Sequence, residues 1–151
     1  MTAAPVVNHQ RVSGNLYFIF HGYCRATNWG EVFAAPIEVY LGDHDFVQPD
    51  LVCVSRERAH IVTEKNISGA PDLIVEILLP STTRADRVNK ANAYARHGVS
   101  HYWIVDPAAR TLEAFELRDG AYVLVAAHAE DETFQPGLFP GLAISLADLW
   151  K

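Results

Sequence analysis

The sequence has few cysteines and no long apolar run, and both absences exclude classes of protein. Only two cysteines occur among its 151 residues, Cys24 and Cys53, and they form no CxxC pair. Neither a zinc site nor a disulfide framework is therefore indicated, and we expect both thiols to be reduced and at least partly buried. No apolar run approaches the roughly 18 residues that span a bilayer, and residues 1–8 lack the features of a signal peptide. A cytoplasmic protein with no membrane segment is expected.

Positive charge is also scarce, and the sequence has no glycine-rich loop for binding phosphate. The net charge of −6 repels a polyanion over the molecule as a whole, so contact with nucleic acid must come from local basic groups. Without the glycine loop, a nucleotide-binding fold is not indicated. What the chain does have is 50% hydrophobic and 20% charged residues, which is the profile of one globular domain over residues 1–151.

The order of the hydrophobic patterns predicts an α/β fold with a central mixed β-sheet flanked by helices. Apolar side chains fall on one helical face in residues 8–23, and a second helix is expected at residues 84–97, after three hydroxyl side chains that can cap it. Residues 55–70 read as a loop or a hairpin arm. Strands are expected at residues 31–41 with a break at Pro36, and at residues 51–54, 73–79, 101–105, 111–117 and 122–127.

Asp50 and Glu76 are the most informative polar residues, since each is a carboxylate at or inside an otherwise apolar strand, where an unpaired charge is costly. If the two strands pair, both carboxylates can converge on one divalent cation, and Mg²⁺ is typically held by one or two carboxylates with water and phosphate oxygens. The alternative is an aspartate at a strand edge and a glutamate paired with a buried basic residue. Asp72 is a weaker candidate ligand, because four residues of strand separate it from Glu76 by roughly 13 Å. It is expected to cap the start of its strand.

Lys90 belongs to the expected second helix, directly after the Glu76 strand. There its ammonium group could stabilise negative charge on a phosphate or orient the attacking water. The alternative is an ordinary surface pair with Asp86, four residues earlier. The apolar pattern predicts an outer or edge position for Lys90 and a buried helix face made of Val88, Ala91, Tyr94 and Ala95. The choice depends on whether Lys90 points toward the sheet.

Histidines and hydroxyl residues give no second site. None of the seven histidines forms an HxxxH pair on one helix, because Gly98 separates His97 from His101. Residues 43–45, Asp-His-Asp, could bind a cation, but a polar turn is the expected structure. Residues 81–83, Ser-Thr-Thr, are expected to cap the helix, since no nucleophile elbow accompanies them.

Several short motifs occur together in an order typical of one known family. They are APDLIVEIL at residues 70–78, PST at 80–82, Asp86, Lys90, Tyr94, GV at 98–99 and YWIVDP at 102–107, preceded by QPDLV at 48–52 and the helix around His9. This pattern resembles the Uma2 family, a set of bacterial domains of unknown function in the restriction-endonuclease-like PD-(D/E)xK superfamily. The resemblance covers nearly the whole chain.

The resemblance implies a restriction-endonuclease-like fold in which Asp50 and Glu76 bind the metal, with the backbone carbonyl of Ile77 as a further ligand. The superfamily usually has a lysine two residues after the glutamate, where this chain has Leu78. The lysine function is therefore implied to have moved to Lys90. The family's N-terminal acidic segment is expected to be missing from this chain.

We therefore expect a Mg²⁺- or Mn²⁺-dependent endonuclease that hydrolyses phosphodiester bonds of nucleic acid, with DNA as the expected substrate and a homodimer as the expected assembly. The alternative is a catalytically degenerate nuclease fold that serves as a DNA-binding or protein-interaction module. Metal-dependent cleavage would separate the two. No motif supports a small-molecule enzyme.

Overall fold

A mixed six-stranded β-sheet forms the centre of the computed structural model, which describes residues 6–42 and 46–151. Strands β6 and β7 are parallel, and the other neighbours in this sheet are antiparallel. In spatial order the strands are β1 (Gly30–Ala34), β4 (Leu51–Ser55), β6 (Leu73–Ile77), β7 (His101–Asp106), β8 (Thr111–Arg118) and β9 (Ala121–Ala129). The predicted α/β architecture with a central mixed sheet is confirmed.

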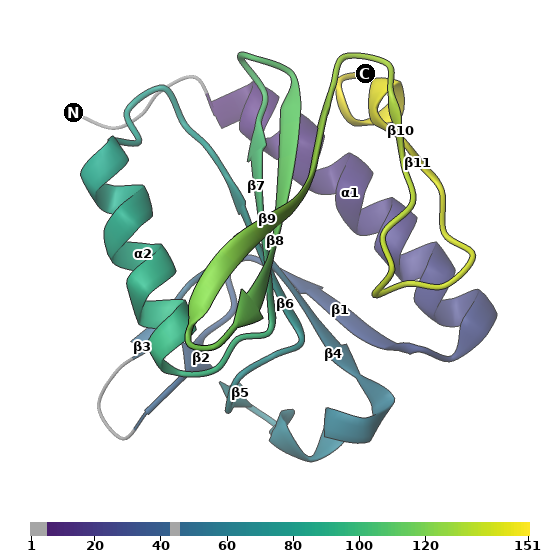
Figure 1. Ribbon diagram of the computed structural model, residues 1–151. Helices are drawn as coiled ribbons and strands as arrows, with labels where there is room; N and C mark the ends of the chain where they lie inside the picture. Colours follow the sequence, from purple (N-terminus) through teal and green to yellow (C-terminus); the bar gives the residue numbers. More distant parts are fainter. Residues whose placement is uncertain (1–5, 43–45) are drawn as a thin grey trace.

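Two helices cover opposite faces of this sheet, α1 (Val6–Thr27) on one side and α2 (Arg84–Arg96) on the other (Figure 1). Each face has its own hydrophobic core. The core under α1 includes the side chains of Leu16, Val75 and Trp103. The core under α2 includes those of Ile74 and Tyr102, because neighbouring residues of a strand point to opposite faces.

Smaller elements surround the sheet. They are β2 (Val39–Tyr40), β3 (Phe46–Val47), η1 (Arg56–Ile61), β5 (Ile67–Ser68), β10 (Thr133–Phe134), β11 (Ile144–Ser145) and η2 (Leu146–Leu149). The strand expected at residues 31–41 is divided into β1 and β2, with a cis peptide bond before Pro36 between them. The segment expected as a loop or hairpin arm at residues 55–70 contains η1 and β5. Within the part of the chain that is described, no helix has the length and apolar character needed to cross a membrane.

Helix α1 is an amphipathic helix held by a regular apolar stripe. Its buried side chains Val12, Leu16, Phe20 and Cys24 recur every four residues, which is close to one helical turn. The ring of Phe20 lies 5.6 Å from that of Trp103 and 5.1 Å from that of Phe139. Full burial of such a side chain stabilises the fold by about 1.5–3 kcal/mol, so α1 is fixed by apolar packing.

Helix α2 begins as expected, and part of its predicted face packs against the sheet, since Tyr94 is buried and Ala91 lies against the same core. Thr83 is the N-cap, and its side chain and that of Asp86 exchange hydrogen bonds with the backbone in a capping box, which also lowers the pKa of Asp86. The predicted burial of Val88 is wrong, because this side chain is 47% exposed. Lys90 and Tyr94, four residues apart, both reach the polar residue Glu76 of the sheet.

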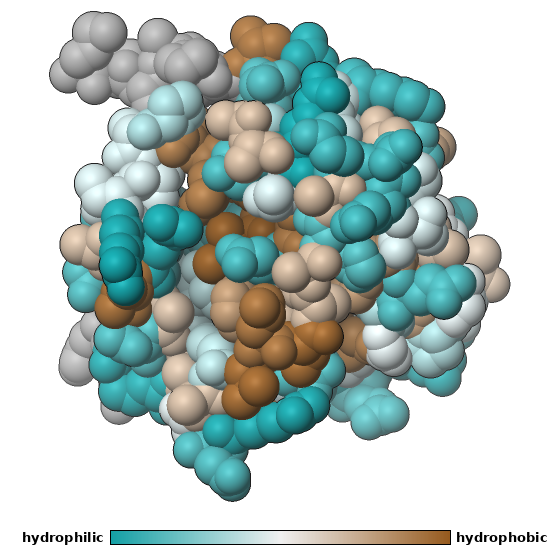
Figure 2. All heavy atoms as spheres, turned by 45° about the horizontal axis from the view of Figure 1, so that its top comes forward, coloured by the Kyte–Doolittle hydropathy of each residue, from teal (hydrophilic) through white to brown (hydrophobic). Residues whose placement is uncertain are grey.

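The outer edge of the sheet carries an apolar surface. Three consecutive residues of β9, Val123, Leu124 and Val125, are 40%, 49% and 41% exposed. Figure 2 shows apolar side chains gathered over this strand, on a face that is otherwise largely hydrophilic. This strand has a partner on one side only, β8.

Two glycine-to-alanine substitutions should change stability in opposite directions. A Cβ at Gly30 would lie 2.1 Å from the carbonyl oxygen of Val54 on the paired strand, so Gly30→Ala should lower the free energy of unfolding by about 1–3 kcal/mol. Gly22 lies inside α1, and a Cβ added there would have nothing within 4 Å. Gly22→Ala should therefore raise the free energy of unfolding by about 0.5–1 kcal/mol. Urea denaturation of both variants measures the difference, and two changes of the same sign would contradict the β1–β4 pairing.

Candidate metal centre

Asp50, which directly precedes β4, lies opposite Glu76 of the neighbouring antiparallel strand β6. Leu51 of β4 pairs with Val75 of β6, and one further step in this register places Asp50 opposite Glu76. Glu76 alternates with the α1-side residues Val75 and Ile77, so its side chain points to the α2 face. The pairing of the two strands therefore brings together the two carboxylates that the sequence singled out.

Glu76 is buried inside β6 and receives two hydrogen bonds from α2. Only 6% of its surface is exposed. The hydroxyl of Tyr94 donates to Oε1 at 2.5 Å, and Nζ of Lys90 lies 3.3 Å from Oε2. Burial raises the pKa of Glu76, while Lys90 and Tyr94 oppose that shift because both stabilise the charged form.

Asp50 is held by the first helix and by the neighbouring strand. Nε2 of His9 in α1 lies 3.0 Å from Oδ1, and the backbone N–H of Ile77 donates to Oδ2 at 2.7 Å. The hydrogen bond to Asp50 raises the pKa of His9, although burial of the imidazole acts in the opposite direction. An imidazole therefore faces one carboxylate, and an ammonium group faces the other.

This arrangement fits a hard divalent cation. Every carboxylate oxygen of the pair has one protein donor, and each oxygen has a second acceptor direction. Mg²⁺ and Mn²⁺ favour carboxylate oxygens and complete their coordination with water and substrate oxygens. Over residues 6–42 and 46–151, no group of three or more acidic, histidine or cysteine side chains forms a ready-made cage. The pair can thus supply two ligands of an open site.

Lys90 points toward the sheet. This orientation is the one that a role beside Glu76 requires, in contrast to a surface pair with Asp86. Its ammonium group contacts Glu76, whereas Asp86 is engaged in the capping box at the start of α2. The expected outer or edge position agrees with this contact: the side chain is 49% exposed and reaches from the edge of α2 to the buried carboxylate. It is the cation nearest to Glu76 among the ion pairs of the described residues.

The other candidates lie away from this pair. Asp72 accepts hydrogen bonds from the backbone N–H of Ser55 at 2.7 Å and from its hydroxyl at 3.1 Å, so it secures the start of β6 as expected. Residues 43–45, the alternative cation site, lie outside the described residues. Ile77 contributes its N–H to Asp50, and its carbonyl as a metal ligand stays a prediction.

Two residues of the centre were not identified as functional from the sequence. His9 continues the apolar stripe of α1, three residues before Val12. A polar residue at such a position indicates a partner in the sheet, and this could have identified His9 from the sequence. Tyr94 was assigned to the core, but a buried tyrosine hydroxyl normally has a polar partner. Its spacing of four residues from Lys90 placed it on the same helix face.

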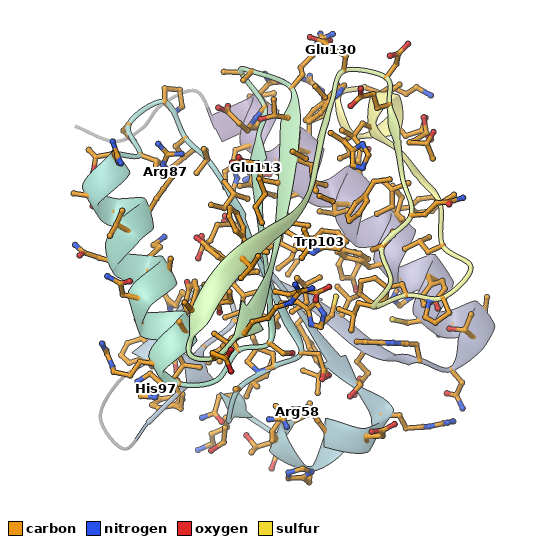
Figure 3. The ribbon with its side chains drawn as sticks, in the orientation of Figure 1. Arg58, Arg87, His97, Trp103, Glu113 and Glu130 are labelled. Carbon is orange, nitrogen blue, oxygen red and sulfur yellow. The ribbon has the colours of Figure 1, made fainter. Side chains whose placement is uncertain are left out.

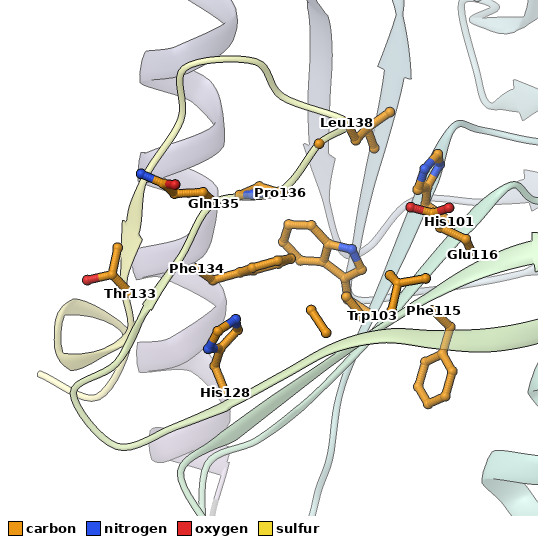
Figure 4. Close-up of a pocket in the computed structure, with 14 residues that line it drawn as sticks. His101, Trp103, Phe115, Glu116, His128, Thr133, Phe134, Gln135, Pro136 and Leu138 are labelled. Carbon is orange, nitrogen blue, oxygen red and sulfur yellow. The ribbon is translucent and has the colours of Figure 1, made fainter.

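A separate cavity of about 620 Å³ lies on the opposite, α1 side of the sheet (Figure 4). Strands β7 to β9 form one wall, and residues 133–138 form the other. The side chains of Trp103, His128 and Phe134 line it, and the imidazole of His128 lies 5.2 Å from the ring of Phe134. Neither carboxylate of the candidate centre contributes to this cavity.

Comparisons with known proteins agree with the fold and with the motifs. The model of the Uma2 family, described as "Putative restriction endonuclease", matches residues 1–147. A crystal structure of "a putative nuclease belonging to DUF820" from Anabaena variabilis aligns with a TM-score of 0.78 and 20% identity, over 97% of this chain and 82% of that one. At this identity the likeness shows the fold alone. None of the curated proteins matches the chain.

Tyr94→Phe should lower stability in a pH-dependent way. The buried Glu76 carboxylate would lose its 2.5 Å hydrogen bond, and hydrogen bonds to charged groups contribute about 1.5–3 kcal/mol. Because this bond stabilises the charged form, the pKa of Glu76 should rise further in the variant. The loss in free energy of unfolding should be complete above the folded-state pKa of Glu76 and shrink as pH falls through it, as measured by urea denaturation in EDTA.

Tyr122→Phe is the matched control. Its hydroxyl donates to the carbonyl of Val99 at 2.7 Å, an acceptor that does not titrate. The control should lose about 1 kcal/mol with no dependence on pH over the range in which carboxyl groups titrate. The same pH profile in both variants would show that the ionisation of Glu76 is not coupled to Tyr94.

Proposed function

The chain belongs to the Uma2 family of "putative restriction endonucleases", and on that premise we propose that it is a metal-dependent endonuclease that hydrolyses phosphodiester bonds in DNA. The observation that carries the proposal is the convergence of Asp50, Glu76 and Lys90 from the residue before β4, from β6 and from α2. An acidic pair with a nearby ammonium group is the chemistry that phosphodiester hydrolysis requires.

Asp50 and Glu76 would hold Mg²⁺ or Mn²⁺ between β4 and β6, with the carbonyl of Ile77 as a further ligand. When bound, such an ion supplies Lewis-acid polarisation of the scissile phosphate and a water of lowered pKa. His9 and Tyr94 orient the two carboxylates through the hydrogen bonds described above. This pre-organisation limits the rearrangement needed for the carboxylates to act together.

Lys90 would stabilise negative charge on the phosphate in the transition state. Its ammonium group is 3.3 Å from Glu76 and half exposed, so it reaches both the buried carboxylate and the solvent side from which a substrate approaches. A compact ammonium group next to the metal ligands can donate to a phosphate oxygen without bidentate geometry. The lysine of α2 would in this way take the role that Leu78 cannot fill.

The proposal also includes a homodimer in the cytoplasm. One such centre cuts one strand at a time, so a second copy of the chain would allow both strands of a duplex to be cut in one binding event. Two free, buried cysteines are compatible with a reducing compartment. Light scattering of the purified protein, alone and with duplex DNA, measures the assembly.

A cleavage assay on single- and double-stranded DNA and RNA, run with Mg²⁺, Mn²⁺ or EDTA, tests the activity directly. Cleavage of DNA with either metal and none in EDTA is expected. Binding of DNA without cleavage in any metal would favour the catalytically degenerate module instead.

Metal should stabilise the wild-type protein through Asp50. Binding to the native state alone raises the free energy of unfolding by about 2.7 kcal/mol at a metal concentration of about 100 Kd. Asp50→Asn should stay folded and lose this increment in a thermal melt with Mg²⁺ or Mn²⁺. Asp131→Asn, which changes the same charge at an exposed turn, should keep it. An equal response in wild type and Asp50→Asn would place the metal elsewhere.

Lys90→Ala should lower the turnover by roughly 10²-fold, because the ammonium group acts on charge that develops in the transition state. The metal-induced rise in melting temperature should not decrease. Lys90→Arg should restore only part of the rate, since its planar group keeps the charge but not the compact geometry. Single-turnover cleavage measures all three rates.

Lys65→Ala is the control for lost positive charge, since Lys65 is an exposed lysine in the segment between β4 and β6. It should cleave at the wild-type rate. If Lys90→Ala keeps the wild-type rate and Lys65→Ala does not, the catalytic lysine is Lys65.

A further inference from the structure

A second cavity, of about 300 Å³, adjoins the candidate metal centre. Its walls come from the start of α1, the connection from β6 to α2, the first turn of α2 and the turn after β7. These segments converge at one end of the sheet (Figure 1). Leu78, Pro80 and Pro107 make its apolar walls, which lower the local dielectric and strengthen any charge interaction inside it.

Arg87 brings an uncompensated positive charge to this cavity. It lies three residues before Lys90, on the side of α2 that faces the sheet (Figure 3). Its Nε is buried, and no group of the described residues accepts a hydrogen bond from it. No ion pair of Arg87 occurs among the described residues, whereas the other cation on this helix face, Lys90, is paired. A buried guanidinium nitrogen without an acceptor is costly, so an anionic ligand would be favoured here.

The remaining polar groups of the cavity present donors. The amide oxygen of Asn8 accepts from Arg11 at 2.8 Å, which leaves the amide nitrogen of Asn8 to donate. The hydroxyl oxygen of Thr82 accepts from the N–H of Leu79 at 3.0 Å, which leaves the hydroxyl proton to donate.

One acidic side chain, Asp106, also lines the cavity. Its Oδ1 accepts from the backbone N–H groups of Ala108 at 3.0 Å and Ala109 at 3.3 Å. The carboxylate therefore serves the turn after β7. The cavity thus has three side chains that can donate hydrogen bonds, Arg87, Asn8 and Thr82, and one carboxylate. A guanidinium group together with neutral donors is the combination that usually binds a phosphate.

His9 connects the cavity to the metal centre. It lines the cavity and lies 3.0 Å from Asp50, so a ligand in the cavity is separated from the carboxylate pair by one imidazole ring. We propose that this cavity binds a phosphate group of the nucleic-acid strand beside the phosphate that is cleaved, with Arg87 as its principal ligand. That the phosphate belongs to a nucleic acid rests on the proposed function. That the cavity binds an anion rests on Arg87 and its neighbours alone.

The first test measures anion binding without nucleic acid or metal. In EDTA, inorganic phosphate should raise the melting temperature of the wild type and of Arg96→Gln, relative to chloride at equal ionic strength. Arg96 is an exposed arginine at the other end of α2, so this control loses the same charge on the same helix. Arg87→Gln should lose the increment while remaining folded, because Arg87 has no hydrogen bond or ion pair to lose within residues 6–42 and 46–151, and Arg87→Lys should keep only part of the increment.

The second test measures the salt dependence of oligonucleotide binding, using Asp50→Asn in EDTA so that no cleavage occurs. Adding Arg87→Gln should reduce the slope of log K against log salt by about 0.7 to 0.9, the equivalent of one phosphate contact, and Arg96→Gln should leave it unchanged. The oligonucleotide is used with a 5′-hydroxyl and with a 5′-phosphate. A reduction in both assigns the cavity to an internal phosphodiester, and a reduction confined to the second assigns it to a strand end.

The outcomes separate this inference from the proposed function. Phosphate stabilisation that depends on Arg87, without binding of any oligonucleotide, would support the anion site and contradict the nuclease. Binding and cleavage of DNA that are unaffected by Arg87→Gln, with no Arg87-dependent response to phosphate, would overturn the anion site and leave the nuclease intact.

Discussion

A carboxylate buried in the middle of an apolar strand needs hydrogen-bond donors or a positive charge beside it. In this protein Glu76 is that carboxylate, and the helix that covers it provides both. Its 6% exposure denies it water, so α2 must supply a hydroxyl and a cation at fixed positions. Tyr94 and Lys90 meet the requirement from positions 18 and 14 residues later in the chain. Two residues of α2, one turn apart, are therefore held against the sheet by this one group.

Local pattern explains why most of the fold could be predicted from the sequence. The strands are short apolar runs bounded by proline, glycine and aspartate, and Asp50 and Glu76 stood out because they interrupt such runs. The apolar stripe of α2 correctly placed Tyr94 against the sheet but not Val88, which is exposed. The contacts of Tyr94 and Lys90 with Glu76 could not be predicted in the same way, because they join two elements far apart in the sequence, and the contact of His9 with Asp50 was missed for the same reason.

Local and global electrostatics act in opposite directions in this molecule. The net charge is −6, yet three basic side chains lie around one end of the sheet: Lys90 contacts Glu76, His9 contacts Asp50, and Arg87 lines the adjoining cavity with His9. A polyanion would be repelled at long range and attracted only near this end. Screening by salt weakens both effects, so ionic strength would change the approach of a substrate and its final contact by different amounts.

The two helices differ in the number of apolar side chains that they bury. This difference determines which part of the native structure unfolds locally at the lowest free energy. Helix α1 buries Val12, Leu16, Phe20 and Cys24, whereas Tyr94 is the buried residue of α2. Segments with few buried apolar contacts exchange their amide hydrogens through local unfolding of low free energy. Helix α2 therefore belongs to a less protected cooperative unit than α1. Helix α2, which carries Lys90, can therefore unfold locally while β4 and β6, which position Asp50 and Glu76, stay folded.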